Sequence, residues 1–557
     1  AGEAGQGLQA IEGIVSLLLK RSGYNVFSAS EFMSRVRGGS NSTVIRVSSE
    51  PMAGYTDRID VLLLLHPKAL ERLSNRISSD TIILADPSVA ASGTATPVDF
   101  SAISAELGGA FYVSTIASGL LSGLFHIDEA HCLSYIREYF AAKGDDVKEK
   151  NCAAFSRGYA IGSGLAELRV SIPRDKAIEG EYLLSGADAV ALGALAGGCD
   201  YVCGYPMSPA TSVLEKMATI SQSHDIIVEQ VEDEIGVVNM AIGAWYSGAR
   251  ALVSTSGGGF ALMTEGVSLA GMIESPLVLH LAQRPGPGTG LPTRTEQGDL
   301  NLVLYAGHGD FPRIVLAPGT LEEAYSLTRK AFMLADKFQV PVFILTDQFF
   351  VDSRRNTPLS GIELAVPPKH ICETDAAYRR FRLTDTGISP RGVPGFGKGV
   401  VCADSDEHDE SGHITENLEV RVTMVDKRNR KLESIRPEII EPHLVGPPDY
   451  STLVICWGST FATVVEAVRT LERKDVAVLH FSWVFPLSDA VGGYLAKARR
   501  LIMVENNYSA QFADLIALST GVRVTNKILK YNGLPFSTEE LAMELEGFLR
   551  DGAHNGT

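Results

Sequence analysis

Short apolar segments alternate with segments of helical period through the middle of the chain, and no other feature of the sequence constrains the fold as much. The alternation predicts strands at 200–203, 225–228, 249–255, 276–282 and 341–346. The helix predicted over 232–248 should turn four large side chains inward: Ile235, Val238, Ile242 and Trp245. Repeated strand–helix alternation of this kind predicts a parallel, doubly wound sheet.

The same alternation appears on both sides of this segment. A glycine loop at 2–7 leads into a helix and is followed by strands at 58–65 and 81–85. The strand expected before the loop is missing, so we expect the sequence to begin within a domain. Further on, strands at 452–457, 476–481 and 501–504 alternate with helices that begin near Ser459 and after Ser509. The predicted fold class is therefore α/β, with several doubly wound parallel-sheet domains at 1–165, 174–352 and 451–557.

Residues 353–450 interrupt the alternation. They contain paired arginines, paired prolines, a glycine-rich stretch and an acidic patch at 404–416. We predict an irregular connecting region here, with strand structure near 418–425.

Two helix starts are predicted from capping patterns. Ser208 has the character of an N-cap residue and is followed by Pro209 at the first helical position, where a missing N–H costs no hydrogen bond. Thr320 and Glu323 have capping-box spacing before a helix that ends near Lys337.

Composition excludes several classes of protein. The chain has 557 residues with 49 basic and 66 acidic side chains, and its formal charge of −17 argues against a nucleic-acid binder. A hydrophobic content of 45% suits a packed globular protein. No apolar run reaches the ~18 residues that a membrane span needs, and the start of the sequence lacks a secretory signal. We therefore expect a cytoplasmic protein without a membrane partner.

The seven cysteines are scattered, as expected in a reducing compartment. Cys199 and Cys203 form the only pair that is close in sequence, and there is no second close pair that could complete a set of four ligands. Buried thiols explain this pattern better than an iron–sulfur cluster held by this chain alone.

Two loops near the N-terminus could contact an anionic ligand. The glycine spacing at 2–7 is not G-x-G-x-x-G, and no acidic residue follows at the distance that a nicotinamide site needs, so a nicotinamide dehydrogenase is only a minor alternative. The loop at 34–42 combines two glycines with two arginines. It is suited to phosphate groups, and a solvated turn is the plain alternative.

Three motifs follow predicted strands, where ligands bind in open α/β sheets. They are Gly204-Tyr-Pro-Met-Ser-Pro-Ala-Thr211, Glu229-Gln-Val-Glu-Asp-Glu-Ile-Gly236 and the Gly/Pro-rich loop at 282–294. Glu234, in the first turn of the helix predicted over 232–248, precedes a run of small residues that lets such a helix approach a ligand or a partner chain closely, although an acidic residue in a first turn is also favoured by the helix dipole. Arg284 and Arg294 can clamp a carboxylate with paired hydrogen bonds, or they can be bystanders on a surface loop.

Taken in order along nearly the whole chain, these motifs resemble those of the 2-oxoacid:ferredoxin oxidoreductases. More narrowly, the chain resembles an alpha subunit with a gamma-type domain fused in front, of the 2-oxoglutarate:ferredoxin oxidoreductase type. Further segments that carry the resemblance are Gly307-His-Gly-Asp310, Asp406-Glu-His-Asp-Glu-Ser-Gly-His413 and Val504-Glu-Asn506 with Gln511. Met207-Ser208 replaces the usual Ile-Thr, so the hydroxyl is kept while substrate preference becomes open.

The resemblance implies a domain and a role for each motif. It implies a gamma-type domain at 1–165, a pyrimidine-binding thiamine diphosphate domain at 174–352 and a transketolase-C-terminal-like domain at 451–557. Glu234 would be the catalytic carboxylate that hydrogen-bonds the aminopyrimidine ring of the cofactor. The other implied contacts are Tyr205, Pro206 and Ser208 with the cofactor, Arg284, Ser208, Thr289 and Arg294 with the substrate, and Arg37, Gly38, Gly39 and Ser40 at the entry of coenzyme A.

The resemblance also implies partners. The sequence contains neither the Gly-Asp-Gly and Asn pair of a Mg²⁺–diphosphate site nor a cysteine quartet. A beta subunit should therefore bring Mg²⁺, the diphosphate site and a [4Fe-4S] cluster, in a dimer of gamma-alpha/beta pairs that passes electrons to ferredoxin. A metal site of this chain's own, for example at His408, Asp409, Glu410 and His413, is not expected, because spacing alone does not indicate a ligand geometry.

The expected reaction is the reversible oxidative decarboxylation of 2-oxoglutarate with coenzyme A to succinyl-CoA and CO₂. A pyruvate or branched-chain 2-oxo acid enzyme is the alternative. A non-catalytic interaction subunit is an alternative of another class, and it would leave Glu234 without effect on turnover.

Overall fold

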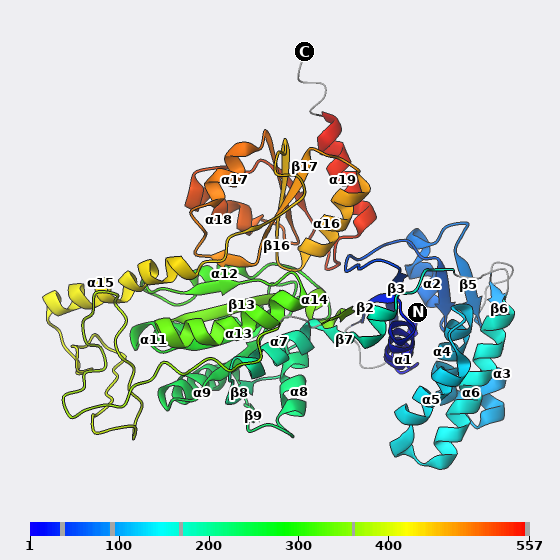
Figure 1. Ribbon diagram of the computed structural model, residues 1–557, viewed down its shortest axis with the longest axis horizontal. Helices are drawn as coiled ribbons and strands as arrows, with labels where there is room; N and C mark the ends of the chain where they lie inside the picture. The colour runs from blue at the N-terminus through cyan, green and yellow to red at the C-terminus, as the bar shows by residue number, and fades with distance from the viewer. Residues whose placement is uncertain (34–38, 90–94, 166–170, 359–361, 552–557) are drawn as a thin grey trace. The chain divides into compact units, whose positions relative to one another are not determined.

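The computed structural model describes residues 1–33, 39–89, 95–165, 171–358 and 362–551. The chain forms two compact units: residues 1–184 with 353–360, and residues 185–352 with 361–557. The first is coloured mainly blue to cyan in Figure 1 and the second green to red. The predicted α/β class with several mainly parallel sheets is confirmed.

The first unit contains a five-stranded and a three-stranded sheet. The five-stranded order is β1-β3-β2-β14-β7, and its β1–β3, β3–β2 and β2–β14 pairs are antiparallel. In the three-stranded sheet β4-β5-β6, which contains the strands predicted at 58–65 and 81–85, the pairs are parallel. The strands are β1 (Gly2–Glu3), β2 (Asn25–Glu31), β3 (Ser40–Ser48), β4 (Val61–Leu64), β5 (Ile82–Ala85), β6 (Thr96–Pro97), β7 (Tyr182–Ser185) and β14 (Arg354–Thr357).

Helices pack together beside these sheets. The helix predicted after the glycine loop is α1 (Leu8–Arg21), whose apolar side chains join the largest core cluster of the unit. The others are α2 (Lys68–Arg72), α3 (Phe100–Leu107), α4 (Val113–Leu124), α5 (Glu129–Tyr139) and α6 (Asp145–Gly164). Helices α4 and α6 approach so closely that a Cβ at Gly158 would lie 1.9 Å from the Ile116 carbonyl oxygen.

The second unit is built on a seven-stranded sheet of order β18-β12-β13-β11-β10-β8-β9. The pairs from β12 to β9 are parallel, and only β18 runs antiparallel to its neighbour. The strands are β8 (Tyr201–Gly204), β9 (Ile227–Gln230), β10 (Ala251–Thr255), β11 (Leu277–Gln283), β12 (Ile314–Leu316), β13 (Pro341–Asp347) and β18 (Trp483–Phe485). The five strands predicted between 200 and 346 are thus confirmed.

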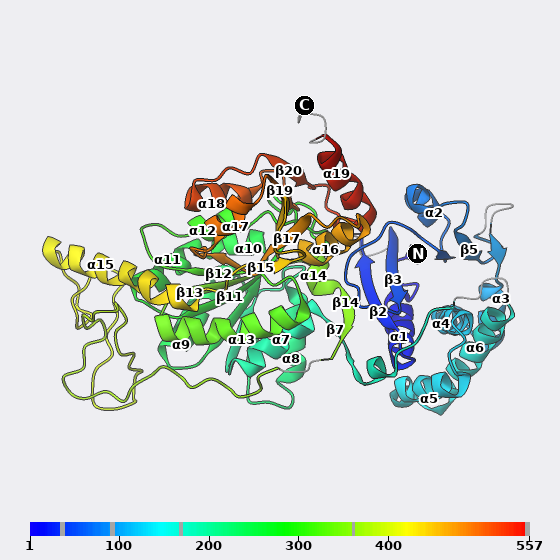
Figure 2. The same cartoon turned by 45° about the horizontal axis from the view of Figure 1, so that its top comes forward.

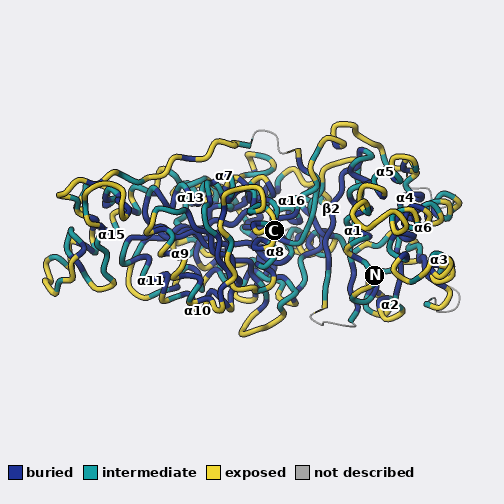
Figure 3. Tube along the Cα trace, turned by 90° about the horizontal axis from the view of Figure 1, so that it is seen from below, coloured by how far each residue is buried: buried dark blue, intermediate teal, exposed yellow. Residues whose placement is uncertain are grey.

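The helices around this sheet, labelled in Figure 2, fall into two groups by their contacts. One group consists of α7 (Gly186–Ala196), α8 (Thr211–Ile220), α13 (Leu321–Phe338) and α14 (Gln348–Asp352), which contact one another. The other includes α9 (Glu234–Tyr246), α10 (Gly257–Leu262) and α11 (Thr264–Met272), which also contact one another, and α12 (Leu300–Tyr305) follows β11. Strands β10, β11 and β13 are buried throughout, as expected of a sheet with both faces covered. Figure 3 shows the burial of each part of the chain, with dark blue marking buried residues.

The C-terminal part of the second unit has a sheet of its own, of order β15-β17-β16-β19-β20. All its pairs are parallel except β15–β17. Its elements are β15 (His443–Val445), β16 (Thr452–Trp457), α16 (Thr460–Thr470), β17 (Val476–Phe481), α17 (Val491–Lys497), β19 (Arg500–Glu505), α18 (Gln511–Thr520), β20 (Asn526–Leu529) and α19 (Thr538–Asp551). The strands and helices predicted here from the sequence are confirmed.

The strand structure predicted near 418–425 is wrong. This segment begins the helix α15 (Leu418–Ile435), drawn in yellow in Figure 1, and Asn417 caps it by accepting hydrogen bonds from Glu419 N and Val420 N. Leu418 and Val422 are exposed, whereas the buried positions 424, 427, 428, 431 and 435 follow helical spacing. The inward face carries lysines and an arginine, which a search for apolar periodicity does not detect.

Three finer predictions also need correction. Ser208 and Pro209 do not begin α8, which starts at Thr211, and the peptide bond between them is cis. Ile235 is 52% exposed, while the other three side chains predicted to face inward from α9 are buried. Thr320 does cap α13, but Glu323 accepts its hydrogen bond from Gly319 N rather than from Thr320, so only half of the capping box is present.

Across the described residues, no single helix is both long and apolar enough to span a membrane. Two helical segments joined by a sharp bend, 100–107 and 110–124, are together long and apolar enough by length and composition alone.

Candidate functional site

Glu234 is the first residue of α9, and the structure buries it at the carboxyl edge of the seven-stranded sheet. Asp233 caps the helix by accepting a hydrogen bond from Gly236 N at 2.7 Å, which fixes the first turn. The Glu234 side chain is directed inward, leaving the residue 4% exposed. Its Oε1 atom is buried and has no hydrogen-bond partner. A buried acceptor without a partner costs about 1–3 kcal/mol, so this atom is suited to receive a donor from a ligand.

A turn of three glycines, 257–259, lies against this carboxylate. A Cβ at Gly259 would lie 2.7 Å from Glu234 Oε1 and 2.4 Å from Thr255 Oγ1, so no larger residue fits there. Gly259 N donates to Met207 Sδ at 3.1 Å, which joins the turn to the motif after β8. None of the motifs singled out from the sequence includes this turn, although a glycine run directly after a buried strand is a recognisable signal of a ligand site.

Arg284 follows β11 and is directed toward the motif after β8. Its Nη1 donates to the Ser208 carbonyl oxygen at 2.7 Å. Partial burial lowers the pKa of Arg284, and the nearby Asp299 carboxyl opposes that shift. The structure thus brings Glu234, Arg284 and Ser208 to one edge of the sheet, as the sequence predicted.

Asp299 is a second acidic group at this edge that the sequence analysis missed. A Cβ at Gly257 would lie 2.4 Å from both of its carboxyl oxygens, so the carboxyl packs directly on the glycine turn. Its Oδ2 is buried and unpartnered. Burial, together with repulsion by Glu296, raises the pKa of Asp299 to about 7, while Arg284 acts in the opposite direction.

The remaining predicted contacts are less enclosed. Tyr205, Pro206, Ser208 and Thr289 are exposed at this edge, and Arg294 is half-buried beside Gly533.

The residues predicted for coenzyme A belong to the first unit. Arg37 and Gly38 lie outside the described residues. Ser40 begins β3, and its hydroxyl accepts a hydrogen bond from Arg72 Nε at 3.2 Å, while Arg72 Nη2 donates to Ser42 Oγ. Gly39 has a φ of +87°, a conformation that favours glycine.

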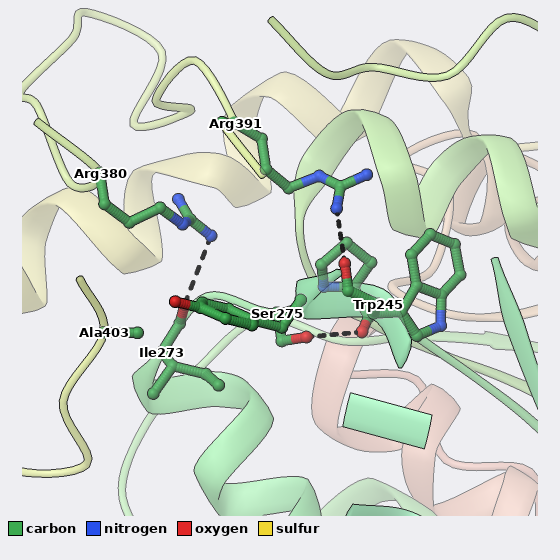
Figure 4. A pocket seen from close by; sticks show the side chains of 9 residues that line it. Trp245, Ile273, Ser275, Arg380, Arg391 and Ala403 are labelled. Atoms are coloured by element: carbon green, nitrogen blue, oxygen red, sulfur yellow. Dashed lines mark hydrogen bonds between the residues drawn. The ribbon is translucent and has the colours of Figure 1, made fainter. Parts of the chain in front are cut away.

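A small cavity of about 20 Å³ lies at the other end of α9 (Figure 4). It is lined by Trp245 and Tyr246, some 18 Å along the helix from Glu234 at 1.5 Å per residue. The guanidinium groups of Arg380 and Arg391 donate to the carbonyl oxygens of Ile273 and Trp245 rather than into the cavity. The cavity is therefore separate from the candidate site.

Metal ligands do not gather in the part of the chain that the structure describes, where no group of three or more His, Cys, Asp or Glu side chains could hold an ion. His408 is instead buried against the Phe381 ring, with a centroid distance of 3.9 Å.

Comparison with known proteins shows the class to which this fold and site belong. A family model described as "Pyruvate flavodoxin/ferredoxin oxidoreductase, thiamine diP-bdg" matches residues 192–427, and "Pyruvate ferredoxin/flavodoxin oxidoreductase" matches residues 1–161. The first of these ranges contains the Glu234 site. The thiamine diphosphate-binding family model therefore accounts for residues 192–427 of the second unit and not for its C-terminal sheet.

The chain belongs to the 2-oxoacid:ferredoxin oxidoreductase family, as an alpha-type enzyme subunit. It is 31% identical to the "2-oxoacid:ferredoxin oxidoreductase subunit alpha" of a Sulfolobus species over 99% of this chain and 96% of that protein. It is 30% identical to the "2-oxoglutarate synthase subunit KorA" of Methanothermobacter marburgensis, over 66% of this chain and 99% of that protein.

A solved structure is similar over nearly the same length. It is the 2-oxoglutarate:ferredoxin oxidoreductase from Magnetococcus marinus with 2-oxoglutarate, coenzyme A and succinyl-CoA bound. The TM-score is 0.89, the identity is 29%, and the match covers 98% of each chain.

Proposed function

We propose that this chain is the alpha part, with a fused gamma-type domain, of a 2-oxoglutarate:ferredoxin oxidoreductase. The reaction is the decarboxylation of 2-oxoglutarate with coenzyme A, with the electrons passing to ferredoxin. The buried, unpartnered Glu234 Oε1 at the start of α9 is the observation that carries the proposal. The domain limits assigned from the sequence, 1–165, 174–352, 353–450 and 451–557, are part of it.

The residues present fit the pyrimidine half of thiamine diphosphate. The aminopyrimidine ring needs a carboxylate shielded from water, and Glu234 supplies one whose free oxygen no group of the described chain occupies. When bound, this cofactor supplies the carbanion chemistry by which a 2-oxo acid loses CO₂. The part of Glu234 is to accept, at Oε1, a hydrogen bond from a protonated ring nitrogen. This hydrogen bond selects the ring tautomer that can act as a base.

Arg284 is assigned to the substrate carboxylate. A guanidinium offers two parallel N–H donors to a carboxylate, and Arg284 has one Nη engaged with the Ser208 carbonyl oxygen, which holds its plane at the edge of the site. The Ser208 hydroxyl, Thr289 and Arg294 are assigned to further contacts with substrate or cofactor.

A beta subunit is assigned the other half of the site. Mg²⁺, the diphosphate and the [4Fe-4S] cluster belong to it in this proposal, because the sequence of this chain has neither the Gly-Asp-Gly motif nor a cysteine quartet. Coenzyme A is assigned to the gamma-type domain, near Gly39 and Ser40. The names and bound ligands of the similar proteins support 2-oxoglutarate as the substrate.

The test is a dye-reduction assay of the complex co-expressed with its beta subunit, in the presence of coenzyme A. We expect turnover with 2-oxoglutarate at a higher kcat/KM than with pyruvate or a branched-chain 2-oxo acid. Glu234→Gln should lower kcat by about 100-fold or more, because general acid–base catalysis is typically worth that much. Glu232→Gln, at an exposed site two residues away, is the matched control and should leave kcat unchanged.

The outcomes separate the alternatives. A preference for pyruvate would overturn the substrate assignment alone. Turnover that is unaffected by Glu234→Gln would point to a non-catalytic subunit, and dye reduction with none of the 2-oxo acids would overturn the reaction itself.

A further inference from the structure

Asp299 is a carboxyl group placed in the site with one oxygen left unsatisfied. Its carboxyl packs on Gly257, its backbone N–H donates to Gln283 Oε1 at 3.0 Å, and Oδ2 is buried without a partner. Gln283 directly precedes Arg284. The hydrogen bond with Gln283 ties Asp299 to the end of β11 that precedes Arg284, and each of the two charged side chains shifts the pKa of the other.

The backbone around Asp299 is held firmly by the C-terminal sheet. Gln297 N donates to Asn506 O at 2.7 Å, and Asn506 N returns a hydrogen bond to Gln297 Oε1 at 3.0 Å. Gln511 Nε2 donates to Gly298 O at 2.8 Å, and Gln511 Oε1 accepts from Asn301 N at 2.8 Å. Hydrogen bonds on both sides of residue 299 therefore clamp the backbone that carries its carboxyl.

The charges acting on Asp299 are few. Glu296 on its own segment repels a negative charge there, and Arg284 from the end of β11 attracts one. Glu234, at the start of α9, packs on the same glycine turn through Gly259. Asp299 itself is the N-cap residue of α12, where the helix dipole favours a negative charge. The first turn of α10 is Gly-Gly-Gly, and α18 presents Gln511. Because burial and Glu296 outweigh Arg284, the pKa of Asp299 is raised to about 7, so the group changes charge near neutral pH.

We propose that Asp299 is a positioning residue of the substrate site, which acts through Arg284 and must be uncharged when the carboxylate of a 2-oxo acid binds. This inference rests on the proposed function. In its charged form Asp299 partly neutralises Arg284 and repels the incoming carboxylate. In its protonated form it leaves the whole positive charge of Arg284 to the substrate, so substrate binding takes up one proton at Asp299.

The experiment is the pH profile of KM and kcat for 2-oxoglutarate, measured with the complete complex by dye reduction. For the unmodified protein, KM should be level below pH 7 and rise above it by up to about tenfold per pH unit, the limit for loss of one required proton. The kcat profile should change less, since saturating substrate restores the bound state. Asp299→Asn should keep KM low and level across the same range.

Glu296→Gln provides a second, independent variant. It removes the repulsion that favours protonated Asp299, so the rise in KM should begin at a lower pH, with the same slope. Gln511→Ala loosens the clamp and should raise KM at every pH without changing the shape of the profile. These two variants keep the test decisive even if Asp299→Asn does not fold.

Three results would overturn the assignment. One is a KM profile of Asp299→Asn that rises above pH 7 as in the unmodified protein. Another is a uniform increase of KM in Asp299→Asn, which indicates a structural role. The third is a rise in KM that begins at the same pH in Glu296→Gln as in the unmodified protein. Each of these leaves the proposed function intact, whereas a complex that reduces dye with no 2-oxo acid at any pH overturns the proposed function and the role of Asp299 with it.

Discussion

Two carboxyl groups, those of Glu234 and Asp299, lie at the edge of the seven-stranded sheet in different surroundings. Glu234 begins a helix, where the dipole favours a negative charge. Asp299 lies near Glu296 and has a buried oxygen, and both effects raise its pKa. The site thus contains two acidic groups at helix starts, and the pKa of one of them, Asp299, is raised.

The glycine at position 259 gives a sharp test of how Glu234 is held. We expect Gly259→Ala to displace the Glu234 carboxylate, because the new methyl group would lie 2.7 Å from Oε1 and 2.9 Å from Cγ. The kcat of the complex in the dye-reduction assay should fall by about 100-fold, as for direct loss of the carboxylate.

Gly258→Ala is the matched control in the same turn. Its Cβ would meet only ordinary contacts, 3.6 Å from the Gly288 carbonyl oxygen and 3.8 Å from Met207 Sδ. We expect its fold and most of its activity to be retained. Equal losses in the two variants would contradict the arrangement described here.

At the scale of the elements, two helices show what apolar periodicity can and cannot predict. Helix α1 was predicted because its inward face is aliphatic. Helix α15 was mistaken for strand because its inward face includes Lys427 and Lys431, which pair with the buried Glu274 at 2.7 and 2.6 Å. The physical cause of its position is charge pairing with a residue more than 150 positions away, for which the local sequence gives no sign.

The contact between α4 and α6 depends on glycines rather than on large apolar side chains. Gly119 and Gly123 on α4 face Gly158 and Gly162 on α6, and an added Cβ at any of them would lie 1.9–2.4 Å from the backbone of the other helix. The two helices can pack this closely only without side chains at these positions.

We expect Gly158→Ala to destabilise the protein by about 1–3 kcal/mol, the usual cost of overpacking. Gly164→Ala, at the end of the same helix, has nothing within 4 Å of its added Cβ and should be neutral or stabilising by up to ~1 kcal/mol. The urea midpoints of the two variants measure the difference. Similar midpoints would mean that the helices do not meet at Gly158.

At the scale of the whole molecule, a buried polar network attaches the connecting segment to α13 and Arg250 within the second unit. Asp336 on α13 is fully buried and accepts hydrogen bonds from Arg250 Nε and Nη2 at 3.2 and 2.9 Å, and also from Arg391 Nη2. Arg250 in turn donates to the carbonyl oxygens of Pro367 and Pro368 at 2.8 Å. The connecting segment, predicted from the sequence to be irregular, is therefore held in place by hydrogen bonds and ion pairs of buried charged side chains.

Replacing Asp336 by Asn would leave two buried guanidinium groups without their counter-charge. We expect a loss of about 3–5 kcal/mol in the free energy of unfolding, as for other buried pairs deprived of one partner. The midpoint of urea unfolding is the measurement. Asp385→Asn, an exposed change within the connecting segment, is the control, and a comparable effect from both would contradict this role of Asp336.

The sequence by itself determined the parallel α/β architecture, the strands of both mainly parallel sheets in the second unit, and the placing of Glu234 and Arg284 after strands. These follow from local spacing, because strand and helix periods and strand-end motifs are properties of neighbouring residues. Only the tertiary structure decided that Gly257 and Asp299 join that site, that Ser208 is not a helix cap, and that α15 is a helix. In each of these cases the deciding contact joins residues distant in the chain, or depends on the path of the backbone, and so leaves no periodic trace in the sequence.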